Sequence, residues 1–97
     1  MTRLEVRHNP EARRFEACVD GALCRADYRM AGDVMHIVHT EVPRRFEGRG
    51  LAGQVVQAAL DYARANGLRV VPVCGYVRAY MRRHADTQDL LADGKRS

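Results

Sequence analysis

The sequence predicts an α/β (α+β) fold in which a mostly antiparallel sheet carries one parallel strand and helices cover both faces. Closely spaced turn signals indicate four short strands in the first half of the chain. An amphipathic stretch over residues 50–66 then indicates a helix, and a valine-rich run at 70–74 indicates another strand. A strand that follows a helical crossover is expected to lie parallel to the strand before it. Residues 1–97 are expected to form a single domain with one core.

Composition and charge limit the classes of protein to consider. The 16 basic and 12 acidic residues give a net charge of +4, which favours anionic ligands without selecting one. No apolar run approaches the roughly 20 residues that span a bilayer, and the N-terminus lacks the apolar stretch of a signal peptide. The three cysteines lack C-x-x-C spacing, which indicates free thiols in a reducing compartment, and the four scattered histidines indicate no metal site. We expect a cytoplasmic protein, monomeric or weakly dimeric, that does not bind a membrane.

A hairpin is predicted around Asp20 and Gly21, because both central positions of a two-residue hairpin turn need positive φ. The resulting register places Cys18 and Cys24 on opposite faces, which excludes a disulfide between them. It also matches opposite charges and apolar residues across the two strands. The predicted pairs are Val19 with Ala22, Ala17 with Cys24, Phe15 with Ala26, Glu16 with Arg25 and Arg14 with Asp27.

The later elements follow from periodicity. A reversal at residues 31–33 leads into a strand over residues 34–42, whose two alternating sets of side chains are both largely apolar. Such a strand is expected to be central and covered on both faces. The helix over residues 50–66 carries one apolar stripe, and Gly67 is placed to end it in a left-handed conformation. A second helix over residues 76–84 and a short apolar turn at Leu90 and Leu91 complete the chain before a polar tail.

The most informative segment is the turn of residues 42–52, between a buried strand and the amphipathic helix. Amide N–H groups at a helix start lack intrahelical acceptors, and glycines such as Gly48 and Gly50 let a phosphate approach them without an intervening Cβ. The turn contains three arginines within a span of six residues. Two glycines alone often serve only tight turning, but the strand, the helix and the arginines together favour a phosphate-binding turn.

Arg45-x-x-Gly48-x-Gly50, followed by Leu51 and Ala52, resembles the pyrophosphate-binding motif of GNAT-superfamily N-acetyltransferases. Residues 39–43 and 72–77, followed by Tyr80, resemble the small, minimal members of that superfamily of the NATD1 type. The resemblance implies a reduced GNAT fold, in which the strands on either side of the main helix splay apart and the pantetheine arm of acetyl-CoA inserts between them. Because proline cannot donate to a sheet ladder, Pro72 fits the point where the ladder is interrupted, or an ordinary strand start.

The resemblance also implies where acetyl-CoA, or coenzyme A, would bind. On the second helix, Tyr76, Tyr80 and Arg83 share one face and could border the pantetheine and phosphates. They could equally be core tyrosines and a solvated arginine. The residues expected to bind the cofactor are Thr40, Val42, Arg45, Gly48, Arg49, Gly50, Leu51, Ala52, Tyr76, Tyr80 and Arg83.

Cys74 and His39 are the candidate catalytic residues. If the two strands splay, the thioester is expected near their C-terminal ends, close to both residues. Cys74 could attack the thioester as a thiolate, with His39 lowering its pKa or deprotonating an incoming amine. Alternatively, Cys74 packs at the end of a strand of valines and His39 is hydrogen-bonded within the sheet. Direct transfer from the cofactor to an amine requires no protein nucleophile.

The expected function is acetyl-CoA-dependent N-acetyl transfer to an unidentified amine, in a small molecule or a protein. In a chain of 97 residues there is no room for the extra elements that enclose the acceptor in larger members of the superfamily, so we expect an open acceptor site. One alternative is a non-catalytic acyl-CoA-binding or sensing module, which would keep the glycine turn and show no turnover. A small nucleic-acid-binding protein is the other, but neither an aromatic platform nor a recognition-helix motif supports it.

Overall fold

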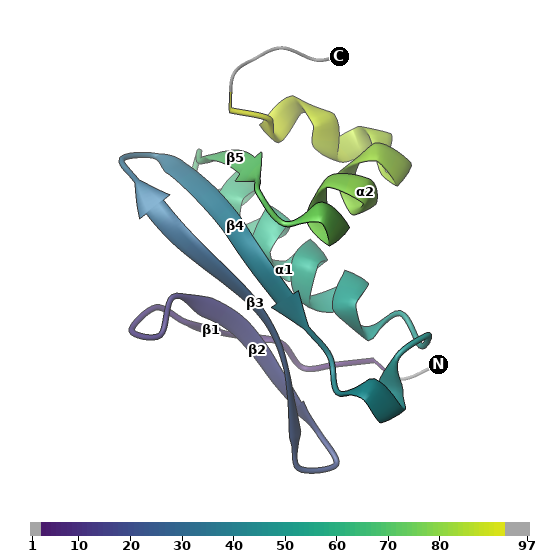
Figure 1. The fold of residues 1–97 in the computed structure, drawn as a ribbon. Coiled ribbons are helices and arrows are strands. Elements are labelled where there is room, and N and C mark those ends of the chain that lie inside the picture. The colour runs from purple at the N-terminus through teal and green to yellow at the C-terminus, as the bar shows by residue number, and fades with distance from the viewer. Residues whose placement is uncertain (1–2, 93–97) are drawn as a thin grey trace.

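The computed structural model describes residues 3–92, which form one five-stranded sheet with helices packed on it (Figure 1). The strands lie in chain order, β1 to β5; β4 and β5 are parallel and the other neighbours are antiparallel. This arrangement confirms the predicted mostly antiparallel sheet with one parallel strand. The elements are β1 (Arg7–Asn9), β2 (Arg14–Val19), β3 (Ala22–Ala31), β4 (Val34–Glu41), the 3₁₀ turn η1 (Arg44–Phe46), α1 (Leu51–Ala65), β5 (Arg69–Pro72), α2 (Gly75–Arg83) and the 3₁₀ turn η2 (Ala85–Leu90).

The hairpin between β2 and β3 has the predicted turn and register. Asp20 and Gly21 both have positive φ, at 50° and 79°, as the two-residue turn requires. All five predicted pairs are present, from Val19 with Ala22 back to Arg14 with Asp27. Cys18 is exposed and Cys24 is fully buried, and both are free thiols. The pleat therefore separates the two sulfur atoms as expected.

A bulge in β4 changes which side chains face the core. Tyr28 of β3 pairs with Ile37, but the adjacent Asp27 pairs with His39, so one extra β4 residue is inserted at Val38. Such a bulge shifts the alternation of side chains by one residue. Thr40 consequently lies on the buried face, opposite Ala26, whereas His39 lies on the other face, opposite Asp27.

Helix α1 supplies most of the contacts that bury the sheet. It starts after Gly50 and ends before Gly67, whose φ of 68° is the predicted left-handed conformation. Its apolar stripe lies against the inward-facing residues of β2 to β5 in two adjoining clusters. Burial of such a stripe, rather than helix propensity, accounts for most of a helix's stability in a protein. The buried residues of α1 are Leu51, Val55, Val56, Ala59, Leu60 and Ala63.

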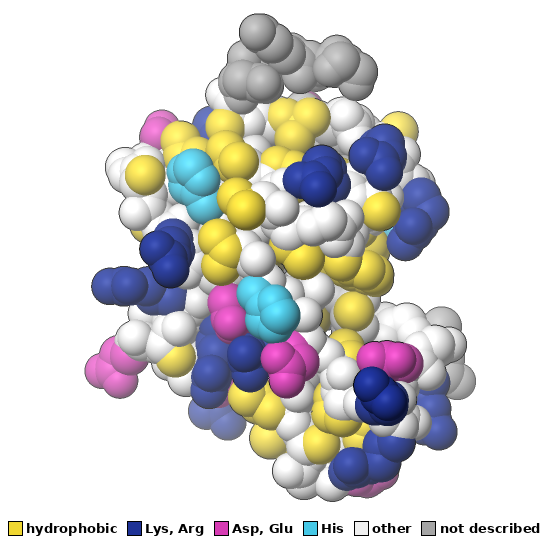
Figure 2. Space-filling model, in the orientation of Figure 1, with side chains coloured by type: hydrophobic (Ala, Val, Ile, Leu, Met, Phe, Trp, Pro, Cys, Tyr) yellow, Lys and Arg dark blue, Asp and Glu magenta, His cyan; other side chains and the backbone are white. Residues whose placement is uncertain are grey.

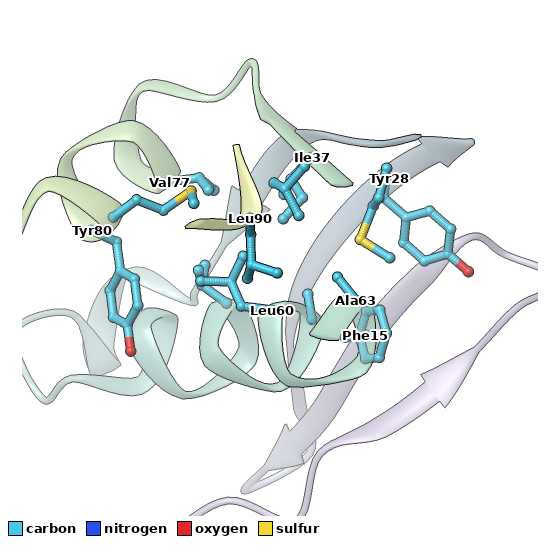
Figure 3. Packing of buried hydrophobic residues seen from close by; sticks show 13 residues of the cluster. Phe15, Tyr28, Ile37, Leu60, Ala63, Val77, Tyr80 and Leu90 are labelled. Carbon is cyan, nitrogen blue, oxygen red and sulfur yellow. The ribbon is translucent and has the colours of Figure 1, made fainter. Parts of the chain in front are cut away.

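Helix α2 lies on the same face of the sheet as α1, so the prediction of helices on both faces is wrong. Val77 and Tyr80 of α2 pack in one cluster with Leu60 of α1 and Ile37 of β4 (Figure 3). The alternate residues of β4, such as Val34 and Val38, are only half-buried. Because both sets of side chains in β4 are largely apolar, the sequence predicted a strand with helices over both of its faces. Within residues 3–92, however, no helix packs over the second set.

The second face of the sheet, which we call the outer face, has a charged region and an apolar region. Charged side chains gather over β2 and β3, and apolar ones gather over β4 and β5 (Figure 2). The charged residues pair within a strand, as Arg14 does with Glu16, and Arg25 also pairs with Glu41 of the neighbouring strand at 3.3 Å. Within the described part of the chain, no helix is long and apolar enough to span a bilayer. The expected polar tail lies outside the described residues.

Candidate functional site

Strands β4 and β5 pair over only four residues and then separate. Their ladder ends with Ile37 beside Pro72, and one further bond joins the Cys74 amide to the Ile37 carbonyl at 3.0 Å. Because proline has no amide hydrogen, it suits the last position of a ladder. The chain then turns into α2, whereas β4 continues to Glu41. Residues 38–41 of β4 therefore have no partner in β5, and the strands separate after Pro72, as one of the two interpretations of this proline expected.

Arg78 of α2 binds the backbone at the end of β5. Its Nη1 atom donates to the carbonyl oxygens of Pro72 and Val73, at 3.1 and 3.2 Å. The arginine therefore satisfies carbonyl groups at the point where the parallel ladder stops. No spacing in the sequence indicated this role for Arg78.

A cleft of about 380 Å³ lies where the gap between the strands meets the start of α1. Gly48 and Gly50 have φ of 85° and 75°, a backbone conformation that other residues adopt only with strain. No side chain caps the helix, so the first amides of α1 face the cleft without a capping acceptor. The structure brings six predicted residues together in its wall: Val42, Gly48, Gly50, Leu51, Ala52 and Tyr76, with Phe46 and Glu47 beside them.

The turn has room for an anion. A Cβ built on Gly48 or on Gly50 would meet no other atom within 4 Å, so the space beside both glycines is open. Arg45 and Arg49 stack on the buried ring of Phe46, with their guanidinium carbons 4.8 and 5.4 Å from the ring centroid. The ring thus fixes two cations at the edge of the cleft. Phe46 was not predicted as a site residue; its position as the aromatic residue within the basic turn was the available signal.

Cys74 lies where β5 ends and α2 begins, across the gap from Thr40. Its sulfur is 3.6 Å from the Thr40 hydroxyl. Burial acts to raise the pKa of the Cys74 thiol, but the amides of Val77, Tyr76 and Thr40, together with that hydroxyl, hold its pKa below the ordinary value. Cys74 is the residue that precedes the first turn of α2, where amides without intrahelical acceptors favour a negative charge. The arrangement favours the nucleophilic form of this cysteine.

His39 does not meet Cys74, because the β4 bulge places it on the outer face. Its Nε2 atom is 3.1 Å from a carboxylate oxygen of Glu41, and both side chains are about half exposed. Hydrogen bonding from His39, with the charge of Arg25 nearby, lowers the pKa of Glu41. From this position His39 faces solvent beside the gap. It is placed to act on a group that approaches from the outer face, but not on the Cys74 sulfur.

Two further predicted cofactor residues lie apart from the cleft. The Tyr80 ring is buried, its hydroxyl donates to Gln57 of α1, and it stacks on His84 with centroids 3.9 Å apart. Burial raises the pKa of Tyr80. Its ring also lies 3.2 Å from where a Cβ on Gly53 would be, so it serves chiefly to join the two helices. Arg83 is exposed in the last turn of α2, which begins at the cleft and runs away from it.

Taken together, the parallel strands that separate after Pro72 and the open glycine turn at a helix start define an α/β domain with an uncapped helix start close to a cysteine. The family model described as GCN5-related N-acetyl-transferase matches residues 14–90. The chain belongs to this family, which confirms the resemblance found in its sequence.

The curated relatives carry the name Protein NATD1. The human protein is 32% identical over 82 residues, which cover 81% of this chain and 73% of that protein. The zebrafish (Danio rerio) protein is 29% identical over 92 residues, covering 92% and 84%. Among solved structures, the fold matches that of a GCN5-like protein from Staphylococcus aureus determined by NMR, with a TM-score of 0.73 and 24% identity over 95% of this chain and 91% of that one. This likeness confirms the predicted α/β fold.

Proposed function

We propose that this protein binds acetyl-CoA in the cleft at the start of α1 and transfers the acetyl group to an amine. The observation that carries the proposal is the open glycine turn at an uncapped helix start, directly beside the gap between β4 and β5. A helix start with unsatisfied amides favours a phosphate group. Membership of the acetyltransferase family supports the choice of acetyl-CoA over other phosphorylated ligands.

The residues of the chain fit the parts of this ligand. The amides around Gly48 and Gly50 and at the first turn of α1 would hold the diphosphate, and Arg45 and Arg49 would add charge. The unpaired edge of β4 over residues 38–41 would pair with the amide-rich pantetheine arm. When bound, acetyl-CoA supplies an acetyl thioester.

We propose Cys74 as the residue that first takes up the acetyl group. Its lowered pKa increases the thiolate fraction, and its place at the gap puts the sulfur beside the free edge of β4. The Cys74 thiolate would form a C–S bond to the acetyl carbon as the C–S bond to coenzyme A breaks, and coenzyme A leaves with the proton that the Cys74 thiol gave up. The amine would then form a C–N bond as the C–S bond to Cys74 breaks, and the proton that the amine loses returns the cysteine to its thiol form through a base. His39, exposed on the outer face, is placed to take the amine proton.

Binding in the cleft is tested by comparing substitutions at two glycines whose backbone φ values are similar. Gly48→Ala and Gly21→Ala both place a Cβ in open space at positive φ, so both variants carry similar backbone strain. Only Gly48 lines the cleft. We expect Gly48→Ala to weaken acetyl-CoA affinity about tenfold or more, roughly 1.4 kcal/mol, and Gly21→Ala to leave it unchanged. Calorimetric titration with acetyl-CoA measures both; equal affinity in the two variants would remove the argument for this cleft.

Mass spectrometry after incubation with acetyl-CoA distinguishes covalent transfer through Cys74 from direct transfer to the amine. One acetyl group on the peptide that contains Cys74, absent in Cys74→Ala, supports the covalent route. Acetylation of an added amine that persists in Cys74→Ala would mean direct transfer instead. Tight binding without any acetylation would favour the non-catalytic acyl-CoA-binding module.

A further inference from the structure

The outer face of the sheet carries a second cavity, separate from the cleft at α1. It has a volume of about 510 Å³, and its wall is rich in arginine. These arginines come from the β1–β2 turn and from β2 and β3, so the fold gathers them on one face from three places in the sequence. The residues that matter here are Arg13, Arg14, Arg25, Arg29, Asp27 and Val38.

Two of the four arginines have acidic partners and two do not. Arg14 pairs with Glu16 at 2.6 Å, and Arg25 pairs with Asp27 at 3.1 Å and with Glu41. Arg13 and Arg29 are exposed and form no ion pair with any residue between 3 and 92. The cavity thus keeps two guanidinium groups whose charge is not neutralised by a carboxylate.

Arg13 occupies a backbone position that favours glycine. Its φ is 57°, in the left-handed region. Its amide donates to the Pro10 carbonyl and its carbonyl accepts from the Tyr28 amide, at 3.1 and 2.9 Å. These two bonds fix the turn and set the Arg13 side chain at the cavity wall. A strained arginine at this point suggests that its side chain, rather than its backbone, has a role.

The cavity adjoins the place where β4 and β5 separate. Val38 lies in its wall and directly follows Ile37, the last β4 residue paired with β5. His39 comes next and faces the same outer side, opposite Asp27. Arg25 and Arg29 of β3 are therefore one strand away from the gap, and Arg13 and Arg14, on the β2 side of β3, are two strands away. A molecule that extends from the cavity across β4 would pass His39.

We propose that this cavity binds the acid group of the acceptor, so that the acceptor is an amine that also carries a phosphate or a carboxylate. The inference rests on the acetyl transfer proposed above. Guanidinium groups match the planar or tetrahedral oxygens of both acids with paired hydrogen bonds. The amine then lies toward His39 and the gap, and the acid lies between Arg13 and Arg29.

Binding of the acid group is tested without acetyl-CoA. Inorganic phosphate is titrated into the full chain at constant ionic strength while the backbone and arginine side-chain NMR signals are followed. Saturable shifts should centre on β2, β3 and Val38. The affinity for phosphate obtained from these shifts should fall about tenfold or more in Arg13→Gln/Arg29→Gln, as expected for lost charge-assisted hydrogen bonds. The charge-matched control Arg7→Gln/Arg82→Gln changes two exposed arginines outside the cavity and should leave this affinity unchanged. Shifts spread over the basic surface, or equal in both variants, would overturn the proposal.

The role in acceptor choice is tested with paired amines. Acetylation of phosphoethanolamine is compared with that of ethanolamine, and that of β-alanine with that of propylamine, so that the two arms distinguish phosphate from carboxylate. The acidic amine of at least one pair should have the higher kcat/KM, and Arg13→Gln/Arg29→Gln should remove this preference mainly through KM. Equal use of acidic and neutral amines would overturn the proposal while the proposed acetyl transfer stands. Failure to bind acetyl-CoA in calorimetry would instead remove the proposed function.

Discussion

At the scale of single residues, the contact between Thr40 and Cys74 brings two distant parts of the sequence together. The two residues are 34 positions apart, and their side chains are 3.6 Å apart. Amides at the start of α2 add to the effect of Thr40 on the sulfur. The sequence alone could equally assign Cys74 to packing. The folded chain surrounds its sulfur with donors that stabilise the thiolate.

The first prediction concerns this cysteine. Loss of the Thr40 hydroxyl in Thr40→Val should raise the pKa of Cys74, because one donor to the thiolate is removed. The pH dependence of alkylation by iodoacetamide, followed on the Cys74 peptide by mass spectrometry, measures the change. The exposed Cys18 in the same molecule serves as an internal control, because its alkylation profile should not move. An unchanged profile at Cys74 would show that the threonine has no electrostatic effect on the thiol.

His8 gives a second prediction at this scale. Its ring stacks on Phe15 with centroids 4.3 Å apart, and its Nε2 atom is 2.6 Å from the Tyr28 hydroxyl. Burial lowers the pKa of His8 below the ordinary value of 6.5, so the unfolded chain binds a proton more readily than the folded one. Stability from this site is present above that value and is lost as pH falls from it through the lower folded pKa. Urea unfolding at several pH values should show that the free energy of unfolding falls less on acidification in His8→Gln than in the unchanged protein. Equal losses in the two proteins would contradict this prediction.

At the scale of elements, one helix stabilises the whole sheet. The apolar stripe of α1 contacts inward residues of β2, β3, β4 and β5, and α2 adds to the same cluster (Figure 3). Leu60 is in the middle of this stripe and only 1% exposed. The turn η2 is held to α1 separately, by the two-pronged contact of Arg64 with Asp89 at 2.9 Å. Because that pair is exposed, it contributes far less than the apolar contacts.

We therefore expect Leu60→Ala to destabilise the fold strongly. The change leaves a cavity between α1, α2 and the sheet, which typically costs about 2–5 kcal/mol. Met30→Ala is the matched control, since Met30 is 42% exposed on the sheet and should cost about 1 kcal/mol or less. Chemical denaturation followed by circular dichroism measures both. Similar losses in the two variants would mean that the packing of α1 does not dominate stability.

At the scale of the whole molecule, the two faces of the sheet differ in role. The inner face is covered by both helices and contains the hydrophobic clusters. Its outer face is open over the described chain, with charges over β2 and β3 (Figure 2). The ladder between β4 and β5 ends at Pro72, and beyond it one bond joins the Cys74 amide to the Ile37 carbonyl. In the proposed reaction, a ligand held at α1 and an acceptor on the outer face meet past the end of this ladder.

Local rules were sufficient for much of this structure. The Asp20–Gly21 turn fixed the hairpin register through its positive φ values, and periodicity placed α1 within a residue of each end. Gly48 and Gly50 of the turn before α1 were also predictable, since positive φ and an open helix start are properties of a short segment. Pro72 marked the end of the ladder because proline lacks an amide hydrogen in any context.

Features that depend on distant segments were decided only by the tertiary structure. The bulge at Val38 arises from pairing with β3, and it alone sends Thr40 inward and His39 outward. Alternating apolar residues in β4 predicted burial on both faces, but burial requires a second layer, which local periodicity cannot supply. The arginine cavity likewise combines residues from three elements. The sequence by itself determined the elements, their order and the glycine turn. Which side chains share a face was decided by the tertiary structure, because facing depends on pairing and packing across the whole sheet.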